Sequence, residues 1–180
     1  MSGFTAIELG GLGNVLISQT GSESLTVSAE DNVLPLLTSD VVDKVLKLGI
    51  RRAPASTRTS RSPTRSPWKD LTGLDVAGSG SQSGSNIKAT GLRVRVAGSG
   101  SVTLSGTVDT QDIQMAGSGA YKGSGMASVA TTINSAGSGN AEVAVRDRLE
   151  VNIIGSGSVT YSGSPQIKQS VLGSGSLQKK

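Results

Sequence analysis

The sequence predicts an all-β protein, a parallel β-helix in which single coils of about 20 residues stack on one another. One observation behind this is the alternation of apolar and polar residues, which indicates strands with one buried face. Another is composition, because the Val, Ile, Thr and Ser that dominate between the Gly-Ser-Gly markers favour strands. The third is a Gly-Ser-Gly marker that recurs at a nearly constant spacing, as is typical of a solenoid. Its copies begin at Gly78, Gly98, Gly117, Gly137, Gly155 and Gly173.

The clearest copy runs from Leu149 to Tyr161, where every second residue is apolar or glycine. The same phrase occurs earlier in the chain, from Leu92 to Leu104. A helical solenoid is disfavoured, because each glycine costs roughly 1 kcal/mol inside a helix. The shared phase predicts one inward-facing set: Leu74, Val76, Leu92, Val94, Val96, Val102, Leu104, Ile113, Met115, Ile133, Val143, Val145, Leu149, Val151, Ile153, Val159 and Tyr161.

The markers are expected to form columns, because stacked coils lie about 4.8 Å apart. Their glycines are predicted to point inward or to sit at a bend, where a side chain would crowd the next coil. Their serines are predicted to form an outward ladder whose hydroxyls hydrogen-bond from coil to coil.

Residues 1–50 carry the repeat only in altered form and are predicted to make an irregular N-terminal coil with cap strands. Within them, residues 4–18 read as a degenerate coil and residues 23–29 as a strand. A proline breaks the apolar run at 31–37, which indicates a helical turn or a corner. Residues 41–50 predict a turn followed by a strand.

Residues 51–70 form a basic Arg/Ser/Pro segment without buried periodicity, predicted to be a long surface loop. Residues 71–180 then carry the β-helix repeats, and the chain is expected to form one structural domain. Residues 51–69 hold six basic residues and no acid, so the rest of the chain has a net charge of −2. The candidate contacts to an anionic glycan or lipid headgroup are Arg51, Arg52, Arg58, Arg61 and Arg65. A solvated loop without a ligand is the alternative. Nucleic acid is not expected, because the segment lacks interleaved aromatic residues.

Composition excludes several classes of chemistry. The chain has no cysteine and no histidine, so it offers no disulfide, no zinc site built on these residues and no Ser-His or Cys-His catalysis. No Gly-Ser-Gly copy continues as a phosphate-binding loop, and no carboxylate column follows the glycines as calcium-binding repeats require. We expect no cofactor and no metal. We also expect no transmembrane helix, because every apolar run is much shorter than a membrane-spanning helix requires.

A polysaccharide-cleaving site is the alternative that the fold class leaves open. It would need two carboxylates about 5–10 Å apart across the sugar. The charged residues available for it are Asp109, Asp112, Glu142, Asp147 and Glu150, with Arg93, Arg95, Arg146 and Arg148. Solvated surface charges, including outward ion pairs of Arg93 with Glu150 or Asp75, are the simpler interpretation.

The residues also resemble a known family. Residues 149–176 are similar to the closing coils of the head GIN domain family, called autotransporter adhesins (DUF2807), and residues 17–35 resemble its N-terminal segment. The resemblance implies a right-handed parallel β-helix of the pectate-lyase-like superfamily and an exported bacterial protein without an established activity. Residues 51–67 depart from the family, whose members continue there with less basic, strand-like sequence.

The sequence therefore favours a non-enzymatic β-helix protein of the cell surface, the extracellular space or the periplasm, with a structural or adhesive role. No signal peptide is recognised in this chain, which leaves a cytoplasmic protein or a processed, exported one. Because the family resemblance implies export, we expect a signal peptide to have been removed. The partners expected are a glycan or cell-surface molecule, or further copies of the chain. Self-association would occur end to end, giving filaments, or by addition of an N-terminal strand. Polysaccharide binding or cleavage on the same fold is the alternative function.

Overall fold

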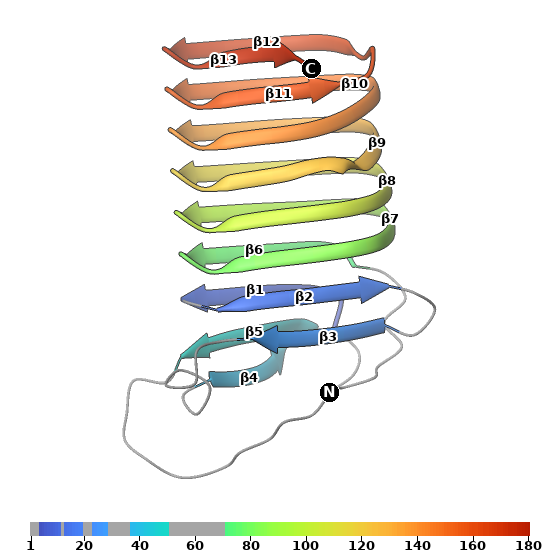
Figure 1. The fold of residues 1–180 in the computed structure, drawn as a ribbon, viewed down its shortest axis with the longest axis vertical. Helices are drawn as coiled ribbons and strands as arrows, with labels where there is room; N and C mark the ends of the chain where they lie inside the picture. Colours follow the sequence, from blue (N-terminus) through green and yellow to red (C-terminus); the bar gives the residue numbers. More distant parts are fainter. Residues whose placement is uncertain (1–3, 12, 20–22, 29–36, 51–70) are drawn as a thin grey trace.

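The computed structural model describes residues 4–11, 13–19, 23–28, 37–50 and 71–180 of the 180-residue chain. Strands are the only regular elements in these residues, which confirms the all-β prediction. In chain order they are β1 (Ala6–Gly11), β2 (Asn14–Gln19), β3 (Glu23–Ser28), β4 (Leu37–Val42), β5 (Val45–Ile50), β6 (Gly73–Gly78), β7 (Ser81–Gly98), β8 (Ser101–Gly117), β9 (Ala120–Gly137), β10 (Asn140–Gly155), β11 (Ser158–Ser162), β12 (Gln166–Gly173) and β13 (Ser176–Lys179). They form one 13-stranded sheet, wound as a solenoid (Figure 1).

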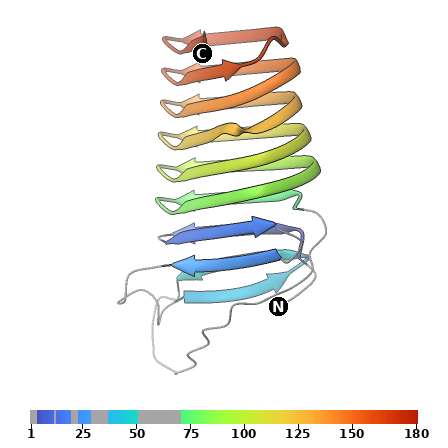
Figure 2. The same cartoon turned by 45° about the vertical axis from the view of Figure 1, so that its right-hand side comes forward.

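Each long strand, β7 to β10, runs along one side of the solenoid, bends, and returns along the other side to the next marker (Figures 1 and 2). The side that leads into each marker is named the pre-marker wall, and the side that follows it is the post-marker wall. The pre-marker wall consists of β1, β6, residues 92–98, 111–117, 131–137 and 149–155, and β12. The post-marker wall consists of β2, residues 81–85, 101–105, 120–123 and 140–144, β11 and β13.

The coils stack in parallel, with inward side chains directly above one another. Leu74 lies opposite Val94, Val94 opposite Ile113, and Ile113 opposite Ile133. The predicted inward set is buried in one continuous core, except that Tyr161 is only partly buried against it. Period 2 and the marker phase were therefore sufficient to predict which face is inside.

The two marker glycines serve different purposes. Gly98 has a φ of +106°, and a Cβ on it would lie 2.7 Å from the carbonyl oxygen of Gly78 in the coil before. Gly100 faces inward, where a Cβ would lie 2.6 Å from the carbonyl oxygen of Gly80. The first glycine therefore makes the turn, and the second allows the walls to meet.

The marker serines connect neighbouring coils through their backbone. The Ser99 amide donates to the Gly78 carbonyl at 3.0 Å, and the Ser118 amide donates to the Gly98 carbonyl at 2.9 Å. A serine hydroxyl contact occurs just after the marker, where Ser101 Oγ donates to Ser81 Oγ at 3.1 Å. Hydroxyl pairing between coils thus lies beside the predicted column of marker serines.

The N-terminal end is built from an extra coil and antiparallel strands. Strands β1 and β2 lie in register under β6 and β7, as expected for the degenerate coil at 4–18. Beyond them, β5 pairs with β1 in parallel, β4 pairs with β5 antiparallel, and β3 pairs with β2 antiparallel. The turn and strand predicted at 41–50 are confirmed, whereas β4 was not predicted. The corner predicted at 31–37 lies mostly outside the described residues, and the loop predicted at 51–70 lies wholly outside them.

Candidate functional site

The outward face of the pre-marker wall carries three straight columns of side chains and is named the ladder face. Each column follows the register of the stacked coils. Starting at the marker, the columns are Ala77, Ala97, Ala116, Ala136, Ile154 and Leu172; then Asp75, Arg95, Gln114, Asn134, Asn152 and Ser170; then Gly73, Arg93, Asp112, Thr132, Glu150 and Lys168. The stacked coils therefore place the side chains of each column at a regular spacing of about 4.8 Å, and alike side chains follow one another in the run Ala77 to Ala136 and in the run Gln114 to Asn152.

The column farthest from the marker contains charged side chains that form ion pairs between neighbouring coils. Arg93 Nε lies 3.1 Å from Asp112 Oδ2, which also accepts a hydrogen bond from Gln114 Nε2 at 3.3 Å. Lys168 Nζ lies 3.0 Å from Glu150 Oε1. These groups are solvated, so each pair contributes little stability, roughly 0–1 kcal/mol. Arg93 pairs with Asp112 rather than with the expected Glu150 or Asp75, because Asp112 is its register neighbour in the next coil.

Asp75 is the half-buried carboxylate of the ladder face. It lies in register between Glu8 and Arg95. Burial raises its pKa above the ordinary carboxyl value, Arg95 opposes this, and the charge of Glu8 raises the pKa further.

The middle column continues as an amide ladder beside a floor of alanine methyl groups. Asn152 Nδ2 donates to Asn134 Oδ1 at 3.1 Å, and Gln114 precedes them in the same column. The alanine column and the amide column line an open hollow of about 520 Å³, which Ile154 borders at its C-terminal end. Its chemistry is an apolar strip beside hydrogen-bonding amides, which suits a ligand that carries both hydroxyl groups and apolar surface.

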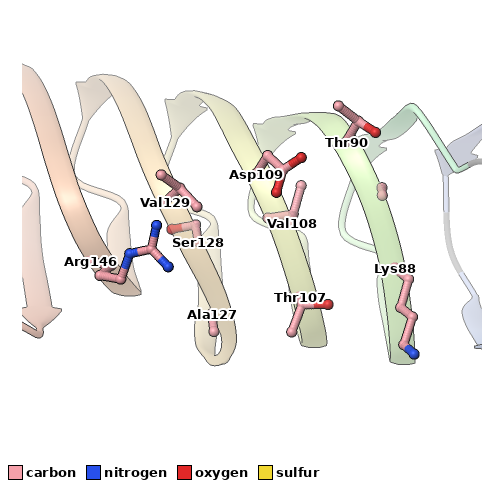
Figure 3. A pocket seen from close by; sticks show the side chains of 10 residues that line it. Lys88, Thr90, Thr107, Val108, Asp109, Ala127, Ser128, Val129 and Arg146 are labelled. Atoms are coloured by element: carbon pink, nitrogen blue, oxygen red, sulfur yellow. The ribbon is translucent and has the colours of Figure 1, made fainter.

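A second hollow, of about 500 Å³, lies on the outside of the bend between the two walls (Figure 3). Lys88, Asp109 and Arg146 line it from three different strands. Arg146 donates from Nε to Asp147 Oδ1 at 2.7 Å and from Nη2 to Asp147 Oδ2 at 3.2 Å. This hydrogen bonding lowers the pKa of Asp147 and raises the pKa of Arg146. Charges of both signs line the hollow, so it favours no ligand of one sign.

The core contains polar groups that sequence reasoning missed. Ser128 Oγ and Thr131 Oγ1 lie 2.7 Å apart, and Ser128 Oγ also donates to the Ala144 carbonyl at 2.9 Å. Tyr121 donates its hydroxyl to Gln111 Oε1 at 3.2 Å, and burial raises the pKa of the Tyr121 phenol well above its ordinary value. These side chains pair inside the solenoid. Their arrangement therefore supports a packing role.

The sequence-predicted site residues are not assembled into one centre among the described residues. The arginines proposed as anionic-ligand contacts, Arg51, Arg52, Arg58, Arg61 and Arg65, lie outside that part of the chain. Three of the candidate carboxylates, Asp112, Asp147 and Glu150, each form an ion pair with a different basic side chain. A fourth, Glu142, has its Oε2 atom 4.0 Å from Lys180 Nζ. Within the described ranges, no three acidic residues gather as a metal site would require. Nor does this part of the chain contain a helix long and apolar enough to cross a membrane.

Comparisons with known proteins agree on family and fold. The family model "DUF2807: Putative auto-transporter adhesin, head GIN domain" matches residues 3–165. A crystal structure described as a "putative adhesin" from Bacteroides fragilis is 21% identical, with a TM-score of 0.71, covering 98% of this chain and 92% of that one. A second, from Parabacteroides distasonis, is 19% identical over the same shares, with a TM-score of 0.60.

A third solved structure, also from Parabacteroides distasonis, is described as a "putative lipid binding protein". It is 22% identical and has a TM-score of 0.50, covering 100% of this chain and 94% of that one. At these identities the likenesses show the fold alone. No curated protein matches the chain.

Proposed function

This chain belongs to the DUF2807 head GIN domain family, and on that premise we propose that it is a non-enzymatic, adhesin-like protein. Its place of action in this proposal is the cell surface, the extracellular space or the periplasm. The ladder face is the contact surface. The observation that carries the proposal is the regular spacing of Gln114, Asn134 and Asn152 beside the alanine floor, on a wall open to large ligands.

A repetitive surface suits a repetitive partner. Three successive coils offer an amide, from Gln114, Asn134 and Asn152, and each amide lies beside an apolar side chain of the neighbouring column. A polymer lying along the solenoid axis would contact these coils at once. Individually weak contacts then add through effective concentration, as in other multivalent binding. We therefore favour a hydroxyl-rich polysaccharide of a cell surface as the partner, which develops the polysaccharide-binding alternative predicted from the sequence.

Binding is favoured over cleavage by the state of the acidic groups. A glycosidase requires an acid and a base facing the same bond. Here Asp112 and Glu150 are held by Arg93 and Lys168 on the open face, and Asp147 is held by Arg146 at the bend. Incubation with uronic-acid polymers is expected to give no increase in the absorbance of unsaturated products. A sustained increase that scales with protein concentration would establish a lyase.

A glycan array tests the binding site. We expect bound glycans with the wild-type protein and at least a tenfold loss of signal with the double variant Asn134→Ala, Asn152→Ala. The matched control is Asn140→Ala, because Asn140 is an exposed asparagine on the opposite wall. A protein that lacks residues 51–67 separates the amide ladder from the arginine segment. Binding that disappears only when residues 51–67 are removed would move the site to the arginines, and an array without bound glycans would contradict the polysaccharide partner.

Self-association at the ends of the solenoid is the second part of the proposal. Paired strands need partners on both edges, and an exposed edge recruits another chain unless it is covered. Sedimentation across a range of protein concentrations tests it. A sedimentation coefficient that rises with concentration supports association, and a constant monomeric value contradicts it.

A further inference from the structure

The C-terminal end of the solenoid concentrates exposed apolar side chains. Seven large apolar side chains are exposed among the described residues, and four of them lie in or directly beside β12. Ile167 is 42% exposed, Val171 is 41% exposed and Leu172 is 70% exposed, and Ile154 stacks in register beneath Leu172. All eight residues of β12 are exposed. Covering this end would therefore bury more exposed apolar side chains than covering any other part of the described surface.

The backbone at this end is directed outward from the stack. Arg93 of β7 shows the direction of the backbone groups. Its amide donates at 2.9 Å to the carbonyl of Thr72 in the preceding coil, and its side chain points out of the solenoid. Because backbone groups alternate along a strand, inward-facing residues direct their N–H and C=O groups to the coil above. Ile167, Gln169 and Val171 occupy inward columns of β12. Their backbone groups therefore point away from β10, along an edge that no described strand covers.

We propose that β12 pairs with β12 of a second copy, antiparallel, about a two-fold axis that passes through Gln169. Gln169 then lies opposite Gln169 of the second copy, and Ile167 lies opposite its Val171. All three facing pairs are of the hydrogen-bonded kind, in which both residues exchange N–H···O bonds. The inference rests on the proposed self-association. It specifies which end of the solenoid associates, which strand forms the contact and which symmetry relates the two copies.

The side chains of β12 are complementary to themselves in this register. Inside, apolar Ile167 meets apolar Val171, and the Gln169 amides meet one another, each able to donate and accept. Outside, Lys168 lies opposite Ser170, so no lysine directly faces a lysine. An isologous contact requires such self-complementarity, and it closes as a dimer.

Head-to-tail stacking fits less well. If the columns stay aligned, Gln169 faces Val41 of β4 in the next copy, and Val171 faces Ser39. Each contact would place a polar side chain on an apolar one. The two-fold arrangement therefore replaces the filament expected from the sequence with a closed pair.

Lysines that commonly protect sheet edges are unevenly distributed here. Lys179 is in β13 and Lys180 follows it, on the post-marker wall. The lysine of β12, Lys168, points outward and binds Glu150 at 3.0 Å. The β12 edge is thus the less protected one.

Sedimentation of the full chain tests association and its location. We expect a monomer–dimer equilibrium for the wild-type protein and a shift to monomer for Val171→Lys, which places a charge inside the interface. Leu172→Lys is the matched control, because Leu172 is its neighbour but points outward, and it should still dimerise. Circular dichroism checks that each variant is folded. A monomeric wild-type protein, or equal behaviour of the two variants, overturns the proposal.

Cysteine cross-linking tests the symmetry, because the chain has no cysteine of its own. In the proposed ladder the two copies of residue 169 have Cα atoms about 5.5 Å apart, within disulfide range. We expect Gln169→Cys to form a covalent dimer on mild oxidation at least tenfold faster than Ser170→Cys, whose copies lie diagonally about 7–8 Å apart. Open-ended assemblies without this preference would retain self-association but contradict the two-fold pairing.

Discussion

The coil that ends at Gly155 and the layer above it carry side chains in the same columns but differ in exposure. Leu149 and Ile153 are 0% and 1% exposed, whereas Ile167 and Val171 directly above them are 42% and 41% exposed. The residue types are alike, so the difference comes from position. Burial in this solenoid is supplied by the coils on both sides, and the last layer has a described neighbour on only one.

The N-terminal end shows another solution to the same problem. Leu46 and Leu48 of β5 lie close to that end, yet both are buried. Strand β4 pairs antiparallel with β5 and provides the next layer. An end of this solenoid can thus be completed by a reversed strand, which is the arrangement proposed for β12 with a second copy.

The largest expected loss of stability distinguishes a buried position from an exposed one in the same middle coil. Val94→Asp places an unpaired charge in the core, where Val94 is fully buried, and should cost about 4 kcal/mol or more. Arg93→Asp removes an exposed ion pair and should cost about 1 kcal/mol. Thermal unfolding followed by circular dichroism measures both. Equal stability of the two variants would contradict the register.

The second prediction compares the middle coil with the last layer directly. Ile153→Ala should cost about 2–5 kcal/mol, because it leaves a cavity between two coils. Val171→Ala, in the same column, should cost less than about 1 kcal/mol in the monomer, because water already reaches that side chain. Urea unfolding at low protein concentration gives both values. Similar losses at the two positions would mean that β12 is covered within the monomer.

A third, smaller effect concerns the marker that both regions share. Gly100→Ala should cost about 1–3 kcal/mol, because its Cβ would lie 2.5 Å from Val76 Cγ1 and crowd the backbone of the coil before. Gly91→Ala is the matched control, because its Cβ would have its nearest contact at 3.4 Å, with the Thr110 hydroxyl. Chemical unfolding compares them, and a loss as large at Gly91 would argue against a special role for the marker.

The smallest prediction concerns pH and the first repeat. The pKa of Asp75 is raised in the folded state, so the folded protein binds the Asp75 proton more tightly than the unfolded chain does. Stability should therefore decrease slightly as pH rises through the range between the ordinary and the raised pKa. Asp75→Asn should lack this component. Thermal unfolding at several acidic pH values tests it, and an unchanged pH slope in Asp75→Asn would refute the assignment.

The wall register could be predicted from the sequence, because period 2 and the glycine marker act on every coil in the same way. The ion pair of Arg93 with Asp112 follows from that register. Predicting it requires the exact number of residues in the coil between them, and the marker spacing, which varies from coil to coil, does not give that number. Strand β4 could not be predicted, because it lacks the marker and pairs antiparallel with β5, to which the turn at Asp43 and Lys44 connects it.

The buried polar side chains also escaped prediction. Gln111, Thr131 and Ser128 occupy inward positions where the pattern expects aliphatic residues. Ser128 and Thr131 form a hydrogen bond with each other, and Gln111 Oε1 accepts from Tyr121, whereas the buried Nε2 of Gln111 has no hydrogen-bond partner among the described residues. Pairs of this kind become visible only after the coils have been placed over one another. The ladder face is similar, since its columns combine residues from six coils.

Hydrogen exchange measured at several protein concentrations tests the central claim, that burial comes from the neighbouring layer, most directly. The amides of Ile167, Gln169 and Val171 should exchange rapidly in the dilute protein and become protected as dimers form. Residues 92–98, enclosed by coils on both sides, should be protected at every concentration. Protection of the Ile167, Gln169 and Val171 amides that is already high in the dilute protein, or that never changes while the protein associates, would contradict the account.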